Sequence, residues 1–187
     1  MINELLKRYP KLVTCKSDIE NALNLMLKAY ENNGKVLVCG NGGNASDSEH
    51  IVGELMKGFM LKRNVDDERI PLNLRKNLQG ALPAISLVSQ SGVLSAFAND
   101  VEPNMVYAQL VYGYGNDGDV LICLSTSGNS KNCVNAAKVA KSIGVKVLSL
   151  TGERESELFE ISDCAVRVPE TETYKIQELH LPIYHYL

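Results

Sequence analysis

The sequence predicts an α/β fold with three layers, in which helices cover both faces of a five-stranded parallel sheet. Two observations predict this architecture. The first is a series of five short runs rich in Val, Ile and Leu, with the weak polar alternation expected of strands that are buried on both faces. These runs are residues 35–39, 83–88, 119–124, 146–150 and 164–168. The second is that helical patterns separate the runs, and alternation of strands and helices is typical of a parallel sheet.

The predicted helices follow from the spacing of apolar side chains. Residues 18–30, ahead of the first strand, are apolar enough to pack on the sheet or on another subunit. Residues 130–143 repeat apolar side chains near helical spacing, and Gly144 is a typical end for such a helix. A last helix holds Gln177 and His185. We therefore expect an N-terminal helix, followed by strands that alternate with helices.

Residues 61–82 do not fit this alternation. They mix charged side chains with scattered Leu and a single Pro. A connection of this length inside a compact domain is more often a binding loop, a lid or an interface element than idle coil. A solvated surface insertion is the alternative interpretation, and the sequence leaves both open.

Length and composition favour one domain, residues 1–187, that acts on small molecules or other subunits. The formal net charge of −3 lacks the basic excess of a nucleic-acid-binding protein. No stretch approaches the roughly 18 apolar residues of a spanning helix, and the first residues lack the basic character of a signal peptide, so we expect no membrane partner and a cytoplasmic location. The five cysteines are odd in number and have no CxxC spacing, which argues against a zinc ribbon or a disulfide framework.

A glycine-rich turn follows the first predicted strand. Residues 40–43 read Gly-Asn-Gly-Gly and lead into a helix that carries His50 and Glu54. Because four residues make about one helical turn, these two side chains project from the same face. The turn lies at a helix N-terminus, where backbone N–H groups and the helix dipole favour an anion. One short segment therefore combines a binding turn with an imidazole and a carboxylate.

A second polar turn follows the third predicted strand. Residues 125–130 read Ser-Thr-Ser-Gly-Asn-Ser, which places four hydroxyl groups and a glycine at the start of a helix. Hydroxyl and backbone donors around a helix N-terminus are typical of a phosphate site. A simple N-cap by Ser130 is the alternative, but it explains only one of the hydroxyls. The turn is neither a Walker loop nor a dinucleotide fingerprint.

The two turns should share a crevice, because doubly wound sheets bind ligands beyond the carboxyl ends of their strands. A phosphorylated ligand would lie there. Asn99 and Asp100, after the second strand and a short helical piece, would offer polar contacts to its hydroxyls at the same edge. The alternative for Asp100 is an N-cap of a helix that starts near Val101.

The tail of the chain contains two of its three histidines. These two are His180 and His185, and the third histidine is His50. A lone histidine on such a helix is usually structural, but here His50, Glu54 and the tail can meet in one place. Imidazole, carboxylate and amide oxygen together suit a divalent ion such as zinc.

Together these motifs resemble those of the SIS domain family of phosphosugar isomerases, and in particular the phosphoheptose isomerases. The motifs that carry the resemblance are residues 40–43 and 125–130, the pairs His50 with Glu54 and Asn99 with Asp100, and Gln177 with His185 eight residues later. The resemblance covers nearly the whole chain. It implies a SIS fold of the flavodoxin or Rossmann type. It also implies an aldose–ketose isomerase that converts sedoheptulose 7-phosphate to D-glycero-D-manno-heptose 7-phosphate for bacterial heptose biosynthesis.

The resemblance implies roles for individual residues as well. The metal ligands, with one zinc ion per subunit, would be His50, Glu54, Gln177 and His185. The phosphate would be held by Ser125, Thr126, Ser127 and Ser130. The sugar would be lined by Asn41, Gly42 and Gly43, with Asn99, Asp100 and Gln177 as further contacts. Members of the family are homotetramers with active sites between subunits, so one site need not be built from one chain.

Isomerisation moves a proton between C1 and C2 of the sugar, so it needs a base for carbon and an acid for the oxygens. The resemblance makes Glu54 the candidate base, acting through an enediol(ate), and His185 the candidate acid. Three positions depart from the family pattern: Asn44 replaces a common Ser, Gly58 a common Arg and Tyr174 a common acidic residue. The competing hypothesis is a non-catalytic SIS module that binds a partner protein or senses a phosphosugar.

Overall fold

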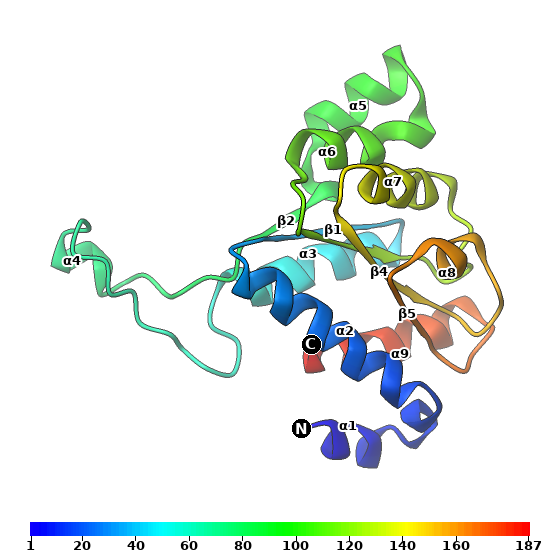
Figure 1. The fold of residues 1–187 in the computed structure, drawn as a ribbon, viewed down its shortest axis with the longest axis horizontal. Coiled ribbons are helices and arrows are strands. Elements are labelled where there is room, and N and C mark those ends of the chain that lie inside the picture. The colour runs from blue at the N-terminus through cyan, green and yellow to red at the C-terminus, as the bar shows by residue number, and fades with distance from the viewer.

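The computed structural model describes all 187 residues and has the predicted three-layer α/β/α architecture (Figure 1). The sheet has five parallel strands in the order β2-β1-β3-β4-β5. The strands are β1 (Val36–Gly40), β2 (Ala84–Ser86), β3 (Val120–Leu124), β4 (Lys146–Thr151) and β5 (Cys164–Arg167). Each of the predicted strands is confirmed, and its ends differ from the prediction by two residues or fewer.

Helices cover both faces of this sheet (Figure 1). One layer contains α1 (Ile2–Arg8), α2 (Lys16–Glu31), α3 (Gly43–Met56) and α9 (Thr173–Tyr186). The other contains α5 (Ser91–Asp100), α6 (Val106–Tyr114), α7 (Lys131–Ser142) and α8 (Glu157–Ile161). Short 3₁₀ helices, η1 (Pro10–Cys15), η2 (Leu87–Ser89) and η3 (Pro103–Met105), join these elements. None of the helices has both the length and the apolar character needed to cross a bilayer.

The central strands send alternate residues into two separate cores. In β1, Val36 and Val38 belong to the core under α2 and α9, whereas Leu37 and Cys39 belong to the core under α6 and α7. Every residue of β1 and of β3 is buried, so neither strand has a solvated side. This double burial is the physical reason for the weak polar alternation in the sequence. All five cysteines are free thiols and four of them are buried, as expected of small apolar side chains.

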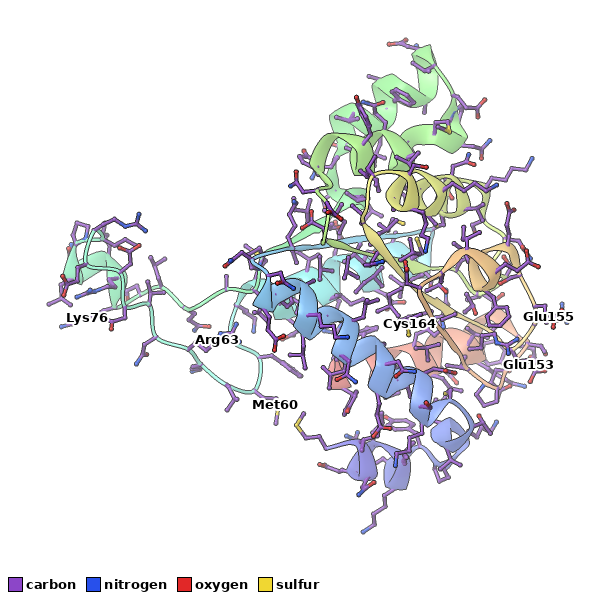
Figure 2. All side chains as sticks on the ribbon, viewed as in Figure 1. Met60, Arg63, Lys76, Glu153, Glu155 and Cys164 are labelled. Atoms are coloured by element: carbon purple, nitrogen blue, oxygen red, sulfur yellow. The ribbon has the colours of Figure 1, made fainter.

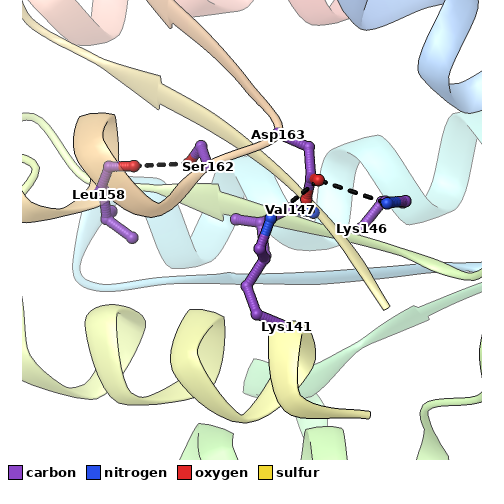
Figure 3. Close-up of polar contacts among 6 residues, drawn as sticks. All are labelled: Lys141, Lys146, Val147, Leu158, Ser162 and Asp163. Carbon is purple, nitrogen blue, oxygen red and sulfur yellow. Dashed lines mark hydrogen bonds and ion pairs between the residues drawn. The ribbon is translucent and has the colours of Figure 1, made fainter. Parts of the chain in front are cut away.

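A carboxylate clamp secures the β5 edge of the sheet (Figure 3). Asp163 accepts a hydrogen bond from the Val147 N–H at 2.8 Å and forms ion pairs with Lys141 at 2.9 Å and Lys146 at 3.5 Å. Burial opposes ionisation of this carboxyl, but the bonds from Lys141 and Val147 outweigh burial and lower the pKa of Asp163. One ionised side chain therefore links α7, β4 and the start of β5.

Residues 57–82, which we call the arm, leave the body between α3 and β2 and extend away from it (Figures 1 and 2). The predicted excursion over residues 61–82 lies within the arm, and its one helix is the single turn α4 (Leu72–Arg75) at the tip. The two legs are joined near the base, where the Gly80 N–H donates to the Arg63 carbonyl at 2.8 Å and the Arg63 guanidinium donates to the Gly80 carbonyl at 2.8 Å. The arm is thus a loop whose two legs are hydrogen-bonded to each other near its base.

Candidate functional site

The two turns that were predicted to bind a ligand lie side by side at one edge of the sheet. β1 pairs with β3 so that Gly40 stands opposite Leu124, and each is the last residue of its strand. The strand order changes direction between β1 and β3, which is the position where open α/β sheets bind ligands. The topology therefore provides the shared crevice that the sequence predicts.

The serine-rich turn directs two of its hydroxyl groups toward each other. Ser125 Oγ lies 2.9 Å from Ser130 Oγ. Ser130 is the N-cap residue of α7, but its side chain makes no cap bond, so capping does not account for its hydroxyl. Gly128 has a φ of +66°, and a Cβ at this position would collide with the hydroxyl of Ser156. Only glycine lets the turn close in this way. The hydroxyls then stand at the N-terminus of a 12-residue helix, where an anion is favoured.

Thr126 and Ser127 lie on the outer side of the same turn. The Ser127 hydroxyl accepts a hydrogen bond from the Asn129 N–H at 3.2 Å, and the Thr126 carbonyl accepts one from the Gly152 N–H at 3.1 Å. Both residues border a polar hollow of about 240 Å³. The four residues predicted to hold phosphate thus share one turn, with two hydroxyls paired at its centre and two at its rim.

Asn41 is held by a second amide that no motif indicated. Its Nδ2 donates to Asn132 Oδ1 at 2.9 Å, and its Oδ1 accepts from Asn132 Nδ2 at 2.8 Å. The hydroxyl of Tyr107 donates to the Gly40 carbonyl at 2.7 Å. The amide pair joins the glycine turn to the first turn of α7, and the Tyr107 bond joins it to α6. The only sequence signal for Asn132 is its place two residues after Ser130.

One face of α3 lies along one face of α9. On each helix, side chains three or four residues apart project from the face that meets the other helix. The α3 side chains on this face include Asp47, His50 and Glu54, and those of α9 include Gln177, Tyr184 and His185. Gly42 is the N-cap of α3, and Gly43, the first residue of the helix, lies against Gln177. A Cβ on Gly43 would come within 2.8 Å of Gln177 Nε2, so the missing side chain leaves room for this amide at the helix start.

Three of the predicted ligands and catalytic side chains meet farther along the two helices. His50 Nε2 lies 3.4 Å from His185 Nε2 and 3.5 Å from Glu54 Oε1. Glu54 Oε2 is buried without a hydrogen-bond partner. Burial, together with the neighbouring His50, lowers the pKa of His185 and keeps its ring neutral at neutral pH. The candidate base and the candidate acid therefore approach the same imidazole nitrogen.

The separations around His50 fit part of a tetrahedral metal site. Ligands about 2.0–2.1 Å from a zinc ion at tetrahedral angles are about 3.4 Å apart, close to both distances from His50 Nε2. No group of three or more His, Cys, Asp or Glu side chains converges closely enough to hold a metal by itself. Gln177 lies eight residues before His185, roughly 12 Å along the helix. The structure therefore places His50 close to Glu54 and close to His185, and leaves Gln177 apart.

Two aromatic residues that no motif indicated contact these imidazoles. Phe59 stacks on His185, with ring centroids 5.5 Å apart, and Tyr184 meets both His50 and His185 edge-on. The Tyr184 hydroxyl lies 3.1 Å from His50 Nδ1 and 3.1 Å from Asp47 Oδ1. Burial raises the pKa of Tyr184, which keeps the phenol protonated, and burial also raises the pKa of Asp47 against the bond from Tyr184.

An apolar cavity of about 200 Å³ borders this cluster. Glu54 and His185 stand in its wall beside Phe59, and residues from the base of the arm, the sheet, α2 and both ends of the chain form the rest of the lining. The polar cluster therefore has an apolar space on one side. This space connects the cluster to the arm.

Asn99 and Asp100 lie elsewhere in this chain. They end α5, in the layer on the other face of the sheet from α3 and α9, and Asn99 Nδ2 donates to Asp100 Oδ1 at 2.7 Å. No hydrogen bond or ion pair joins them to the two turns. Asp100 is not the predicted N-cap either, because Glu102 accepts the capping bond from the Asn104 N–H.

His180 is a buried structural residue. Its Nε2 lies 3.4 Å from the Thr151 carbonyl, and burial lowers its pKa to about 4. Of the two histidines in the tail, only His185 reaches His50.

The chain is similar to proteins of one family over almost its whole length. A family model described as SIS domain matches residues 2–152. The phosphoheptose isomerase of Helicobacter pylori strain P12 is 39% identical to it over 184 residues, which cover 98% of this chain and 86% of the relative. The phosphoheptose isomerase of Rhodospirillum rubrum is 36% identical over 95% of this chain and 86% of its own.

Solved structures show the same similarity. The phosphoheptose isomerase of Neisseria gonorrhoeae matches with a TM-score of 0.79 at 29% identity, covering 99% of this chain and 90% of its own. The phosphoheptose isomerase of Francisella tularensis matches with a TM-score of 0.80 at 28% identity, over 98% of this chain and 90% of its own. Fold and sequence therefore agree.

Proposed function

The chain belongs to the SIS domain family and, within it, to the phosphoheptose isomerases, and on that premise we propose that it converts sedoheptulose 7-phosphate to D-glycero-D-manno-heptose 7-phosphate. This is an aldose–ketose isomerisation in bacterial heptose biosynthesis. The observation that carries the proposal is the approach of Glu54 and His185 to His50, on helices that start beside a hydroxyl-lined turn. A non-catalytic SIS module would not need a carboxylate and an imidazole at these positions.

The reaction needs a proton carrier at carbon, and Glu54 is placed for that role. It removes a proton from C1 of the ketose and returns it to C2 of the enediol(ate). The buried and unpartnered Oε2 supports this assignment, because an oxygen without a protein donor keeps its lone pairs for substrate.

The C2 oxygen must also gain a proton and the C1 oxygen must lose one, and His185 is placed to carry out both transfers. It supplies a proton to the C2 oxygen and accepts one from the C1 oxygen as the carbonyl moves. A neutral imidazole carries one N–H and one lone pair and can do both. The lowered pKa of His185 supports this neutral form.

The phosphate would bind at the turn of residues 125–130, held by Ser125, Thr126, Ser127 and Ser130 with the N-terminus of α7. The sugar would extend past Asn41, Gly42 and Gly43 toward Gln177 and the paired helices. Asn44, where the family commonly has Ser, is 4% exposed and its Oδ1 has no partner. It would accept a hydrogen bond from a sugar hydroxyl.

A zinc ion would be held by His50, Glu54 and His185, and Gln177 would join them from another copy of the chain or after a rearrangement. The two donor separations near 3.4 Å support this ligand set. When bound, the ion would polarise the carbonyl and stabilise the enediolate.

The active unit in this proposal is a cytoplasmic homotetramer with active sites between subunits. The arm supports contact with a second copy, because it carries six basic and three acidic side chains. The whole chain has a net charge of −3 and the arm +3, so the remaining residues carry −6. Figure 2 shows Lys76 on the arm and Glu153 and Glu155 at opposite ends of the molecule, so the arm reaches such acidic side chains only on another copy.

The direct test is turnover of sedoheptulose 7-phosphate by the purified protein, followed as formation of the aldose phosphate. Glu54→Gln should lower kcat by about 10²- to 10⁴-fold, because it removes the base and keeps the shape. Glu49→Gln is the matched control on the same helix, where the carboxylate binds the Ser89 hydroxyl at 2.8 Å, and should keep full activity. Full activity of Glu54→Gln would exclude Glu54 as the base, and a wild-type protein inactive on heptose phosphates would exclude this substrate.

A further inference from the structure

A short chain of hydrogen bonds runs behind the His50 imidazole, on the side away from Glu54 and His185. His50 Nδ1 lies 3.1 Å from the Tyr184 hydroxyl, and the same hydroxyl lies 3.1 Å from Asp47 Oδ1. Asp47 and His50 belong to α3, and Tyr184 belongs to α9. Neither Asp47 nor Tyr184 has a role in the proposed reaction or metal site.

We propose that Asp47 and Tyr184 are positioning residues that fix the tautomer of His50, with its proton on Nδ1 and its lone pair on Nε2. This inference rests on the proposed site only for its functional consequence, because the tautomer itself is a property of the protein alone. It follows from the directions that the hydrogens must take.

The direction of the chain is set at its carboxylate end. An ionised carboxylate only accepts hydrogen bonds, so the single Tyr184 proton points to Asp47. The Tyr184 oxygen then has only lone pairs to offer on its other side, and it accepts a hydrogen bond from the Nδ1–H of His50. A neutral imidazole with its proton on Nδ1 has a lone pair on Nε2.

Packing holds the chain in this arrangement. Tyr184 is only 8% exposed, so its hydroxyl has little access to water if the partners are lost. Its ring meets His50 edge-on, with centroids 5.4 Å apart and an interplanar angle of 76°, and meets His185 in the same way. A flip of the His50 ring would exchange the nitrogen that faces Tyr184 for a carbon.

The consequence concerns Glu54. Its Oε1 lies 3.5 Å from His50 Nε2, so a small approach would let a proton on Nε2 form a charge-assisted hydrogen bond and occupy the carboxylate. With the proton held on Nδ1, His50 has no hydrogen to donate there. Glu54 then keeps its lone pairs for a substrate proton or a cation, and Nε2 offers its own lone pair to the same point.

The test reads the tautomer directly. In chelator-treated full-length protein with ¹⁵N-labelled histidine rings, nitrogen shifts report which ring nitrogen of each of the three histidines carries the proton. The His50 signals are identified by their loss in His50→Gln. We expect the proton on Nδ1 in the wild type and a shift of the proton toward Nε2 in Tyr184→Phe, which removes only the hydroxyl.

Function gives a second readout. Tyr184→Phe should lower kcat about ten- to hundredfold with KM within about twofold, and should weaken zinc binding, measured by competition with a chelator, by about tenfold or more. Asp47→Asn should act in the same direction, because an amide can donate to the Tyr184 oxygen and reverse the chain. Tyr30→Phe is the matched control, since it also removes a hydrogen-bonded tyrosine hydroxyl, here one that donates to the Pro83 carbonyl away from the site.

The outcomes separate this inference from the proposed function. A wild-type His50 with its proton on Nε2, or an unchanged tautomer in both Tyr184→Phe and Asp47→Asn, would overturn the positioning role whatever the enzyme does. A proton on Nδ1 that moves in both variants would support the positioning role even if sedoheptulose 7-phosphate were not turned over. If Tyr184→Phe fails to fold by circular dichroism, Asp47→Asn decides the matter alone.

Discussion

The arm follows α3 directly along the chain, but the paired helices α3 and α9 differ from it in how their side chains find partners. Between the helices, Asp47, Tyr184 and His50 find their partners within the same chain. On the arm, Met60 and Leu61 are each 78% exposed. Apolar surface of this kind is typical of an interface. The comparison teaches that a single chain supplies the hydrogen-bond partners of His50 but leaves the apolar surface of the neighbouring arm uncovered.

The two regions meet at the base of the arm, where the Leu82 N–H donates to the Leu55 carbonyl at 2.9 Å. Phe59, near the start of the arm, stacks on His185 with an interplanar angle of 22°. Gly58 beside it donates its N–H to Gln79 Oε1 at 2.8 Å, and a Cβ there would come within 3.0 Å of that oxygen. The family's common Arg is thus replaced by a glycine that closes the base of the arm. A change in the arm therefore has a direct path to His185.

Removal of the arm tip is the strongest way to break this comparison. Residues 64–78 can be replaced by a short Gly-Ser linker, because Arg63 and Gly80 are already joined by hydrogen bonds. If the chain assembles as the proposed homotetramer, its native mass, measured by light scattering, should fall from four times 20.5 kDa to that of a smaller species. We expect kcat to fall about 100-fold, since a small displacement of His185 through Phe59 misplaces the acid.

The body should keep its fold in this variant, because the ion pairs of the tip stay within the arm. Circular dichroism and thermal unfolding check that control. An unchanged mass together with unchanged activity would restore the alternative interpretation of the arm as a solvated surface insertion.

The same contrast shows what could be predicted from the sequence. The strands were predicted within two residues, because burial on both faces leaves an apolar run that can be recognised locally. The shared face of His50 and Glu54 follows from helical spacing, and the serine-rich turn follows from its composition. These features depend on residues that are close along the chain.

Features that depend on distant residues could not be predicted. Tyr184 meets Asp47 across 137 positions of the chain, and Asn41 meets Asn132 across 91. Asn99 was expected at the site because it follows the second strand, but α5 carries it into the other helical layer. Nothing in a local pattern specifies which helix covers which face of the sheet.

A second prediction concerns the loss of folding stability in acid, which should come from a residue of α9 rather than from the arm. His180 has a pKa of about 4 in the fold against 6.5 when exposed, so the unfolded chain binds its proton more readily. Its contribution is therefore fully present above pH 6.5 and is lost as the pH falls toward 4. Urea unfolding across this window should show a loss of about 3 kcal/mol that His180→Leu removes.

An exposed group on the arm provides the control. Bonds from Arg69 lower the pKa of Asp67, but this pair is open to solvent and Asp67→Asn should leave the pH curve unchanged. A wild-type curve that is flat between pH 6.5 and 4 would contradict the buried neutral state of His180.

A third prediction sharpens the description of the paired helices. Gly43→Ala places a Cβ 2.8 Å from Gln177 Nε2, and this flexible amide must move away from the start of α3. We expect kcat/KM for the heptose phosphate to fall about tenfold, the equivalent of about one lost hydrogen bond, with little change in stability. The effect should vanish when Gly43→Ala is made in a Gln177→Ala background. A full additional loss in that background would place the role of Gly43 elsewhere.

The smallest expected effect comes from the outer side of the same helix. Gly53 is an exposed residue within α3, and a Cβ there would meet no atom within 4 Å of the chain. Gly53→Ala should therefore stabilise the fold by up to about 1 kcal/mol, because alanine loses less backbone freedom in a helix, and should leave kcat unchanged. If the variant instead lost activity or assembled into a smaller species, the outer side of α3 would also be covered by a second copy. The surface that a second copy covers would then extend from the arm onto α3 itself, to the residue next to Glu54.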